Sequence, residues 1–196
     1  MDAVDVGPGA AAADRRNRGA GSSRGFLTVH DQARFFVAER LVGLPAYRHV
    51  VEIGGRDING GVRDLVMRRQ GVESYISLDL FEGPGVDVVA DATKWSPPGL
   101  VDLVICCEVL EHAPDPSGVV SSAVSWLAPG GTLIVTCATD PRAPHSGHDG
   151  AGLRAGEYYG NVAPEHLGEW LDALPVLAST YVAPDRGDLY ATAVKA

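Results

Sequence analysis

The first half of the chain contains four short apolar runs, and each run ends at a carboxylate or at glycine. The runs occupy residues 50–55, 75–79, 86–91 and 101–108. Strands that are buried on both faces carry continuous Val, Ile and Leu runs, whereas half-exposed strands alternate apolar and polar residues. The pattern therefore predicts a parallel sheet that is covered by helices on both faces. Because ligands bind at the carboxyl ends of parallel strands, the acidic run ends predict a ligand site there.

The rest of the chain continues this alternation of strands and helices. We expect strands near residues 49–54, 74–79, 86–90, 101–107, 131–138, 176–183 and 188–194. We expect helices near residues 28–44, 60–70, 117–127 and 164–173, and a Pro-Gly-Gly turn at 129–131 that begins the fifth strand. Only residues 184–188 separate the last two strands, which is the length of a hairpin connection. The predicted fold class is α/β: a single-domain, doubly wound, Rossmann-like sheet of about seven strands, mostly parallel with one antiparallel edge hairpin strand.

The N-terminal segment differs from the rest in composition. Residues 1–25 are rich in Gly, Ala, Ser and Arg and hold almost no large apolar side chains. Burial of such a segment cannot offset the entropy that ordering it would cost. We therefore divide the chain into a flexible tail, residues 1–25, and one folded domain, residues 26–196.

Charge and cysteine content narrow the range of partners. The formal net charge of −9 at pH 7 disfavours nucleic acid, because its binding depends largely on Lys and Arg. No apolar stretch approaches the ~20 residues that span a bilayer, so we expect no membrane segment. The N-terminus has the features of neither a signal peptide nor a transit peptide. The three cysteines lie in apolar runs, as buried free thiols do, which favours a reduced, cytoplasmic setting.

Several segments carry a stronger signal together, in this order, than any one of them alone. They are Glu52-Ile53-Gly54-Gly55, the acidic ends Asp79 and Asp91, the run Cys107-Glu108-Val109-Leu110-Glu111-His112, and the turn Leu127-Ala128-Pro129-Gly130-Gly131. On these segments, residues 30–196 resemble the class I S-adenosylmethionine-dependent methyltransferases. The run at 107–112 is similar to the quinone and small-molecule branch of that family. The resemblance implies S-adenosylmethionine as cofactor and S-adenosylhomocysteine as its product.

The resemblance also implies roles for the strand ends. A glycine turn lets the backbone approach the methionine part and the ribose, since no Cβ atom intervenes. Asp79 would accept both ribose hydroxyls, and Asp91 would accept the adenine amino group. The cofactor-binding residues implied in this way are Glu52, Gly54, Gly55, Asn59, Asp79, Leu80, Asp91, Ala92, Cys107 and Glu108. The acids could instead cap a helix or close a turn, and Glu108 and Glu111 could lie on a solvated face.

The glycine turn departs from the usual family pattern. Arg56 and Ile58 stand where the family carries its second and third glycines, and Asn59-Gly60-Gly61 offers another route to a tight turn. The chain also lacks the Gly-x-Gly-x-x-Gly pattern of dinucleotide-binding folds and the Gly-Lys-Ser/Thr pattern of P-loops. The departure keeps a non-catalytic S-adenosylmethionine-binding protein open as an alternative.

Three histidines are candidates for catalysis. His112 follows the fourth strand, where a neutral imidazole could take a proton from an acceptor hydroxyl, although it could instead order the turn that follows it. His145 and His148 lie in the long segment after the fifth strand, and long loops at the ligand end of a sheet commonly carry function. Together with Asp149 they could bind a metal, but this pattern in a glycine-rich loop is not specific, and we predict no metal site.

These expectations combine into one function. We expect the chain to transfer the methyl group of S-adenosylmethionine to a small-molecule acceptor and to release S-adenosylhomocysteine. The donor is already activated, so catalysis needs mainly alignment and, for a hydroxyl acceptor, a base. Residues 139–161 would cover the acceptor, with Tyr158 and Tyr159 as aromatic walls or as anchors of the loop. The alternatives are a methyltransferase that acts on nucleic acid or protein, and the non-catalytic binding protein. A homodimer is left open.

Overall fold

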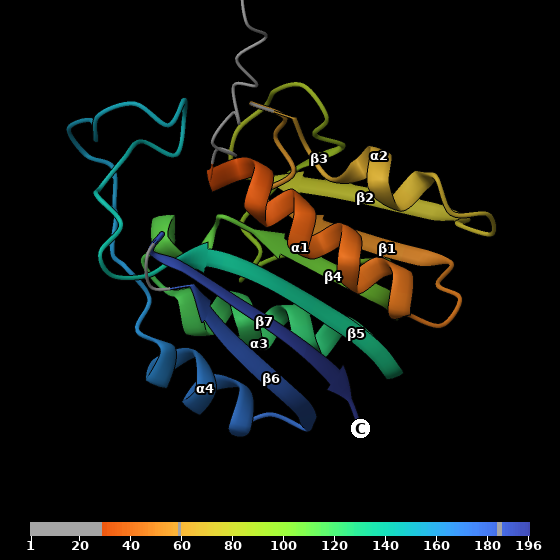
Figure 1. Ribbon diagram of the computed structural model, residues 1–196. Coiled ribbons are helices and arrows are strands. Elements are labelled where there is room, and N and C mark those ends of the chain that lie inside the picture. The colour runs from red at the N-terminus through yellow and green to blue at the C-terminus, as the bar shows by residue number, and fades with distance from the viewer. Residues whose placement is uncertain (1–28, 59, 184–185) are drawn as a thin grey trace, which may run out of the picture.

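The computed structural model describes residues 29–58, 60–183 and 186–196, which form one seven-stranded sheet with helices on both faces (Figure 1). The strands are β1 (His49–Ile53), β2 (Ser74–Asp79), β3 (Val88–Val89), β4 (Val101–Cys107), β5 (Leu127–Ala138), β6 (Val176–Ala183) and β7 (Asp188–Lys195). The helices are α1 (Val29–Gly43), α2 (Arg63–Met67), the short 3₁₀ helix η1 (Leu110–His112), α3 (Pro116–Trp126) and α4 (Pro164–Asp172). The α/β fold class predicted from the sequence is confirmed. The predicted tail, residues 1–25, and Asn59 lie outside the described residues.

The strand order is β3-β2-β1-β4-β5-β7-β6. From β1 the chain adds β2 and β3 on one side and then returns to add β4 on the other side, so the topological switch point lies between β1 and β4. β1 pairs in parallel with both β2 and β4, so these carboxyl ends share one edge of the sheet. Ligands bind outside the carboxyl ends of the strands at such a switch point. The expected antiparallel edge is the β6–β7 hairpin, in which β7 runs antiparallel to both β5 and β6.

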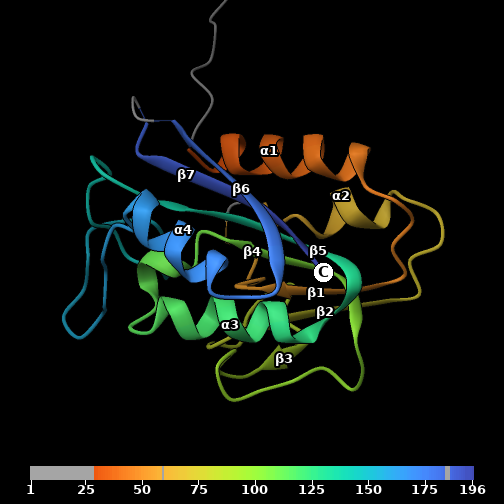
Figure 2. The same cartoon turned by 90° about the horizontal axis from the view of Figure 1, so that it is seen from below.

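The central strands bury side chains on both faces, as their continuous apolar sequences predict. In β4, Leu103 and Ile105 belong to the core cluster that includes residues of α1 and α2, whereas Val104 and Cys106 belong to the cluster that includes α3 and α4. All four side chains are at most 1% exposed. Figure 2 shows the two pairs of helices on opposite sides of the sheet. Within the described residues, no helix combines the length and the apolar character that crossing a membrane requires.

Two elements are shorter than the sequence predicts. Helix α2 spans Arg63–Met67 rather than residues 60–70, because Gly60 (φ 104°) and Gly71 (φ 95°) adopt left-handed conformations on either side of it. Strand β3 is only Val88–Val89 rather than residues 86–90. It is bounded by Gly85, which has φ 84°, and by the turn that begins at Asp91. Both elements are therefore limited by the turns beside them and not by their apolar content.

Strand β5 begins four residues earlier than the predicted position 131. Leu127 already pairs with Val101, and the next pairing joins Thr132 to Leu103, so the Pro-Gly-Gly segment forms a bulge inside the strand. Gly130 makes the bulge possible with φ 78°. The turn chemistry was correctly identified, but pairing with β4 continues on both sides of the bulge.

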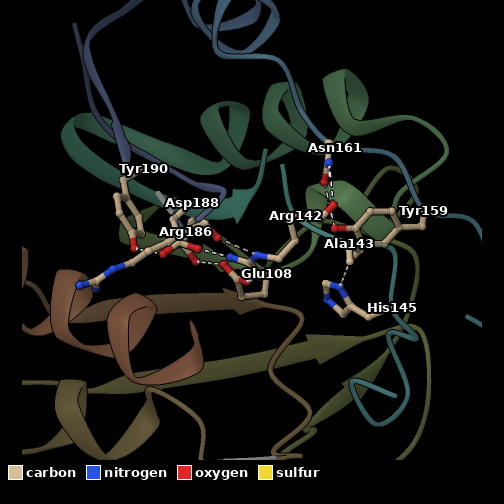
Figure 3. A network of polar contacts seen from close by, with 10 residues as sticks. Glu108, Arg142, Ala143, His145, Tyr159, Asn161, Arg186, Asp188 and Tyr190 are labelled. Atoms are coloured by element: carbon tan, nitrogen blue, oxygen red, sulfur yellow. Dashed lines mark hydrogen bonds and ion pairs between the residues drawn. The ribbon is translucent and has the colours of Figure 1, made fainter. Parts of the chain in front are cut away.

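The segment between β5 and α4 is tied to the sheet through Arg142 (Figure 3). Arg142 is only 11% exposed and forms ion pairs with Asp188, at the start of β7, and with Glu108, just after β4. Its Nη1 atom lies 3.4 Å from Glu108 Oε2, and the second oxygen of Asp188 accepts a hydrogen bond from Tyr190 at 2.8 Å. Asn161, near the far end of the segment, donates to the Arg142 carbonyl at 2.9 Å. One guanidinium group thus joins β4, β7 and the loop.

We predict that Arg142→Met lowers the free energy of unfolding by about 3 kcal/mol, because removing one partner from a buried ion pair leaves the other charges uncompensated. Arg142→Lys should cost less, since the charge is kept although the two-pronged geometry is lost. Urea denaturation monitored by circular dichroism measures the difference. The matched control is Arg154→Met on the same loop, where the exposed pair with Asp149 should contribute less than about 1 kcal/mol. Equal losses in Arg142→Met and Arg154→Met would contradict the anchoring role of Arg142.

Candidate active site

The turn after β1 has no room for side chains at two positions. Gly54 has φ 76°, and a Cβ atom there would lie 2.1 Å from Val109 Cγ2. A Cβ atom on Gly55 would lie 1.9 Å from Ser77 Oγ. The amides of both glycines donate to the Leu78 carbonyl at 2.8 and 3.2 Å, which fixes the turn against the end of β2. Both glycines are therefore required by packing. Gly55 is buried, and the partly exposed Gly54 leaves backbone without a side chain at the switch point of the sheet.

Glu52 lies beneath this turn and not at its surface. Glu52 is only 4% exposed, and its Oε2 atom accepts a hydrogen bond from the Tyr75 hydroxyl at 2.5 Å. Burial raises the pKa of Glu52, and the Tyr75 hydrogen bond partly offsets this rise. The arrangement supports the turn from below.

The end of β2 presents an acid next to exposed apolar side chains. Asp79 Oδ1 accepts a hydrogen bond from the Phe81 amide at 2.9 Å, so the carboxylate begins a tight turn. Leu80 and Phe81 are 57% and 47% exposed. Large apolar side chains at a strand end, beside a carboxylate, are suited to contact a flat ring that carries a polar sugar.

The Asp91 carboxylate closes a turn, which is the alternative role that the sequence left open for the acidic strand ends. Its carboxylate accepts hydrogen bonds from the Lys94 ammonium at 2.7 Å and from the hydroxyl and amide of Thr93 at 2.7 and 2.9 Å. These bonds lower the pKa of Asp91 to about 2, and the hydrogen bond from Lys94 contributes most. Ala92 beside it is buried at 7% exposure. The Lys94 side chain is 81% exposed, so it can leave Asp91 without disrupting the fold.

Arg56, the residue that departs from the family glycine pattern, connects the turn to the long loop. Its Nη2 atom donates to the Gly147 carbonyl at 2.9 Å, and its guanidinium lies 5.4 Å from the centre of the Phe81 ring. A Cβ atom at Gly83 would lie 2.6 Å from Arg56 Cδ, so Gly83 provides the room for this side chain. Sequence reasoning identified Arg56 as a departure but missed this contact. The glycines at 83 and 147 were the available signal.

Cys107 and Glu108 lie at the end of β4, where the sequence places cofactor contacts. Glu108 has φ 54°, a left-handed conformation that costs energy in a residue with a side chain. Its carboxylate accepts a hydrogen bond from Thr136 Oγ1 at 3.0 Å and pairs with Arg142. Burial raises the pKa of the Cys107 thiol. Both Glu108 oxygens thus have polar partners within the protein, Thr136 for Oε1 and Arg142 for Oε2, which contradicts the alternative of a solvated face for this residue.

His112 and His145 are brought together by the folding of the loop over η1. Their ring centres lie 5.0 Å apart, and Tyr159 contacts both rings at 5.4 and 4.9 Å. Figure 3 shows His145 beside Tyr159 at one end of the polar network. Burial, with a smaller contribution from His145, lowers the pKa of His112 to about 4. The imidazole of His112 is therefore neutral near pH 7, with a lone pair on one nitrogen.

Glu111 lies behind these rings and is fully buried, so the solvated-face alternative is wrong for it as well. The sequence signal for this burial was the place of Glu111 in a short 3₁₀ turn directly after the apolar Leu110.

His148 belongs to a different group of contacts from His145. Its ring lies 4.5 Å from the Phe81 ring, and its Nδ1 atom is 3.4 Å from Arg56 Nη1. Asp149 pairs with Arg154. The structure therefore places His148 against Phe81, the neighbour of the predicted cofactor residue Leu80, and His145 beside His112, so the three catalytic candidates do not form one cluster.

Comparisons with known proteins point to one family. A family model for a methyltransferase domain matches residues 29–174. The ubiquinone biosynthesis O-methyltransferase of Burkholderia vietnamiensis is 34% identical over 98 residues, which cover 50% of this chain and 38% of that protein. The enzyme of the same name from Marinobacter nauticus is 32% identical over 105 residues, or 54% of this chain and 41% of the relative. The matches thus span less than half the length of these curated relatives.

Solved structures of methyltransferases share the fold. The structure of DhpI in complex with SAH (S-adenosylhomocysteine) has a TM-score of 0.62 at 25% identity, and the match covers 86% of this chain and 87% of that one. CalS10, an amino pentose methyltransferase from Micromonospora echinaspora with SAM (S-adenosylmethionine) bound, also has a TM-score of 0.62, at 17% identity, covering 85% and 91% of the two chains. At that identity the likeness to CalS10 shows the fold alone. The family match includes the glycine turn, all the acidic strand ends and η1, and the chain belongs to the methyltransferase-domain family.

Proposed function

We propose that this protein transfers the methyl group of S-adenosylmethionine to a small-molecule acceptor and releases S-adenosylhomocysteine. The observation that carries the proposal is the pair Gly54 and Gly55, which keeps bare backbone at the switch point beside Asp79. The bound cofactor supplies a methyl group that is activated by its sulfonium sulfur. The chain contributes an acid at the end of β2, exposed apolar side chains beside it and a turn without Cβ atoms, and this set fits a nucleoside joined to an amino acid.

The cofactor-binding roles of the predicted residues form part of the proposal. Gly54 and Gly55 would contact the methionine part and the ribose, Asp79 the ribose hydroxyls, and Leu80 the adenine. Asp91 would release Lys94 when the adenine amino group arrives, and Ala92 would lie beside the ring. Glu52, Cys107 and Glu108 support the turn and the strand end from within.

The acceptor would bind between η1 and the loop after β5. His112, His145 and Tyr159 provide an aromatic wall there, and His112 offers a neutral nitrogen. The names of the curated relatives specify O-methylation, which favours a hydroxyl acceptor. The net charge of −9 disfavours a nucleic acid acceptor. A panel of phenols, sugars and amines, assayed for S-adenosylhomocysteine release, tests the proposal against a purely S-adenosylmethionine-binding protein.

The remaining proposals concern context. We propose that residues 26–196 act as one methyltransferase domain, since a single sheet and two core clusters hold the described part together. The free thiols Cys106, Cys107 and Cys137 support a reduced, cytoplasmic setting.

We predict that Asp79→Ala weakens S-adenosylhomocysteine binding by about 2–4 kcal/mol, because two charge-assisted hydrogen bonds are lost. Isothermal titration calorimetry measures the affinity. The control is Glu82→Ala, which removes an exposed carboxylate from the same connection and should leave the affinity unchanged. Unchanged affinity in Asp79→Ala would remove Asp79 from the cofactor site.

The two histidine groups predict two different kinetic effects. His112→Gln and His145→Gln should lower kcat by roughly 10²-fold or more, the usual range for a lost proton-transfer or positioning group, with cofactor affinity kept. His148→Gln should instead weaken cofactor affinity, because His148 packs on Phe81, which is next to the proposed adenine contact Leu80. Turnover and calorimetry on all three variants check this division. A loss of turnover without a loss of cofactor affinity in His148→Gln would place it with the acceptor residues.

Glu52 predicts a specific pH dependence of stability. Burial raises the pKa of Glu52 above its unfolded value of about 4.3, so the folded protein holds this proton more tightly than the unfolded chain. The free energy of unfolding should therefore fall as the pH rises from about 4.3 through the raised pKa. In Glu52→Gln this part of the slope should vanish, as urea denaturation across the pH range would show. Parallel stability curves for the two proteins would contradict the buried, proton-binding state of Glu52.

A further inference from the structure

We propose that Glu111, His112 and His145 together bind one divalent transition-metal cation at the carboxyl edge of the sheet. Each residue offers one ligand atom, and the three atoms lie within 4.8 Å of one another. Glu111 and His112 come from η1, and His145 comes from the loop that Arg142 ties to the sheet. The group forms only in the folded chain, which explains why the sequence pattern predicted no metal site.

Glu111 is the observation that points to a ligand. It is 0% exposed, and neither carboxyl oxygen has a hydrogen-bond partner among the residues that the structure describes. The backbone amides of Glu111 and Ala138 favour its ionised form, but neither is aligned for a hydrogen bond. A buried carboxyl without a partner either keeps its proton or pairs with a cation, because an isolated buried charge is too costly.

The imidazole of His145 is held as metal ligands usually are. His145 Nδ1 lies 3.1 Å from the Ala143 carbonyl oxygen, so Nδ1 carries the proton and Nε2 keeps its lone pair. Histidines that bind metals almost always donate their second nitrogen to a carbonyl or carboxylate, as His145 does here. The centre of the His112 ring lies 5.0 Å from that of His145, and both rings offer a nitrogen to the same cluster.

Arg142 favours the ionised form of Glu111 electrostatically, but it forms no hydrogen bond with that carboxyl. Its two terminal nitrogens bond Glu108 and Asp188, so its single charge is shared between two carboxylates. With Glu111 ionised, three carboxylates and one guanidinium leave two negative charges. A divalent cation would balance both.

The donor set indicates which cations bind. Two imidazole nitrogens and one carboxylate oxygen favour Zn²⁺, Mn²⁺ or Co²⁺ over Mg²⁺ and Ca²⁺, which prefer oxygen donors alone. Three protein ligands leave a coordination position for water or another oxygen. The catalytic use of that position rests on the proposed function: a bound acceptor hydroxyl would lose its proton to solvent water more readily, and its oxygen would then be the nucleophile.

The test measures binding of the metal alone, so it needs neither acceptor nor turnover. Metal-free protein, prepared with a chelator, is titrated with Zn²⁺ by calorimetry and with Mn²⁺ by electron paramagnetic resonance. We expect one ion per chain and at least about tenfold weaker binding in Glu111→Gln, His112→Gln and His145→Gln, since even changes outside the first ligands cost that much. His145→Gln alters a partly exposed loop side chain, so it keeps the test decisive if the buried Glu111 variant fails to fold.

Two histidine controls exclude other sites. His166→Gln removes an exposed histidine of α4, and His148→Gln removes the second histidine of the loop; both should bind the cation as the unchanged protein does. Absence of stoichiometric binding, or equal weakening in His148→Gln, would overturn the site. S-adenosylhomocysteine affinity in the same preparations reports on the proposed function separately. Cofactor binding without metal binding would refute the metal site alone, and metal binding without cofactor binding would refute the proposed function alone.

Discussion

The contact between Arg142 and two carboxylates is the interaction on which the proposed acceptor side of the site depends. Glu108 and Asp188 come from strands that lie on either side of β5, and both are turned toward the loop that leaves β5. Asp188 is 2% exposed, so its charge would be costly without the guanidinium. Arg142 belongs to the loop, so its ion pairs with these two carboxylates also fix the position of the first loop residues in space. His145 and Tyr159 then reach His112 as a consequence.

The proposed cofactor side depends on glycines, which have no side chains. Gly54 and Gly55 bring the backbone against Val109 and Ser77, and Gly83 leaves space that Arg56 fills. Arg56 in turn holds the loop through the Gly147 carbonyl. The loop between β5 and α4 is therefore attached twice, by Arg142 at its beginning and by Arg56 near its middle. This double attachment joins the loop to the turn after β1 and to the residues at the end of β4 and the start of β7, with His148 and His145 in separate groups of contacts.

Most of the carboxylates in this largely buried part of the fold have a hydrogen-bond or ion-pair partner, which is why they can lie there. Tyr75 satisfies Glu52, and Thr136 and Arg142 satisfy Glu108, so each of these carboxylates has a partner that comes from another strand or loop. Asp91 is satisfied within its own turn. Glu111 differs from them because its surroundings are the two imidazoles and the ends of β4 and β5. An unsatisfied buried carboxyl calls for an explanation, and the proposed cation supplies one.

The sequence by itself determined the sheet, because continuous apolar runs such as 101–107 can be buried only between two layers, and periodicity reports this directly. It also determined that Gly54, Asp79 and His112 lie at one edge, since parallel strands end together. The limits of α2 and β3, and the bulge in β5, depended on backbone pairing that no local pattern encodes. Only the tertiary structure decided the partners of the acids and histidines. The contacts of Arg142 with Asp188 and of Arg56 with Gly147 join residues far apart in the chain, and so does the proximity of Glu111 to His145. Loop folding sets such distances.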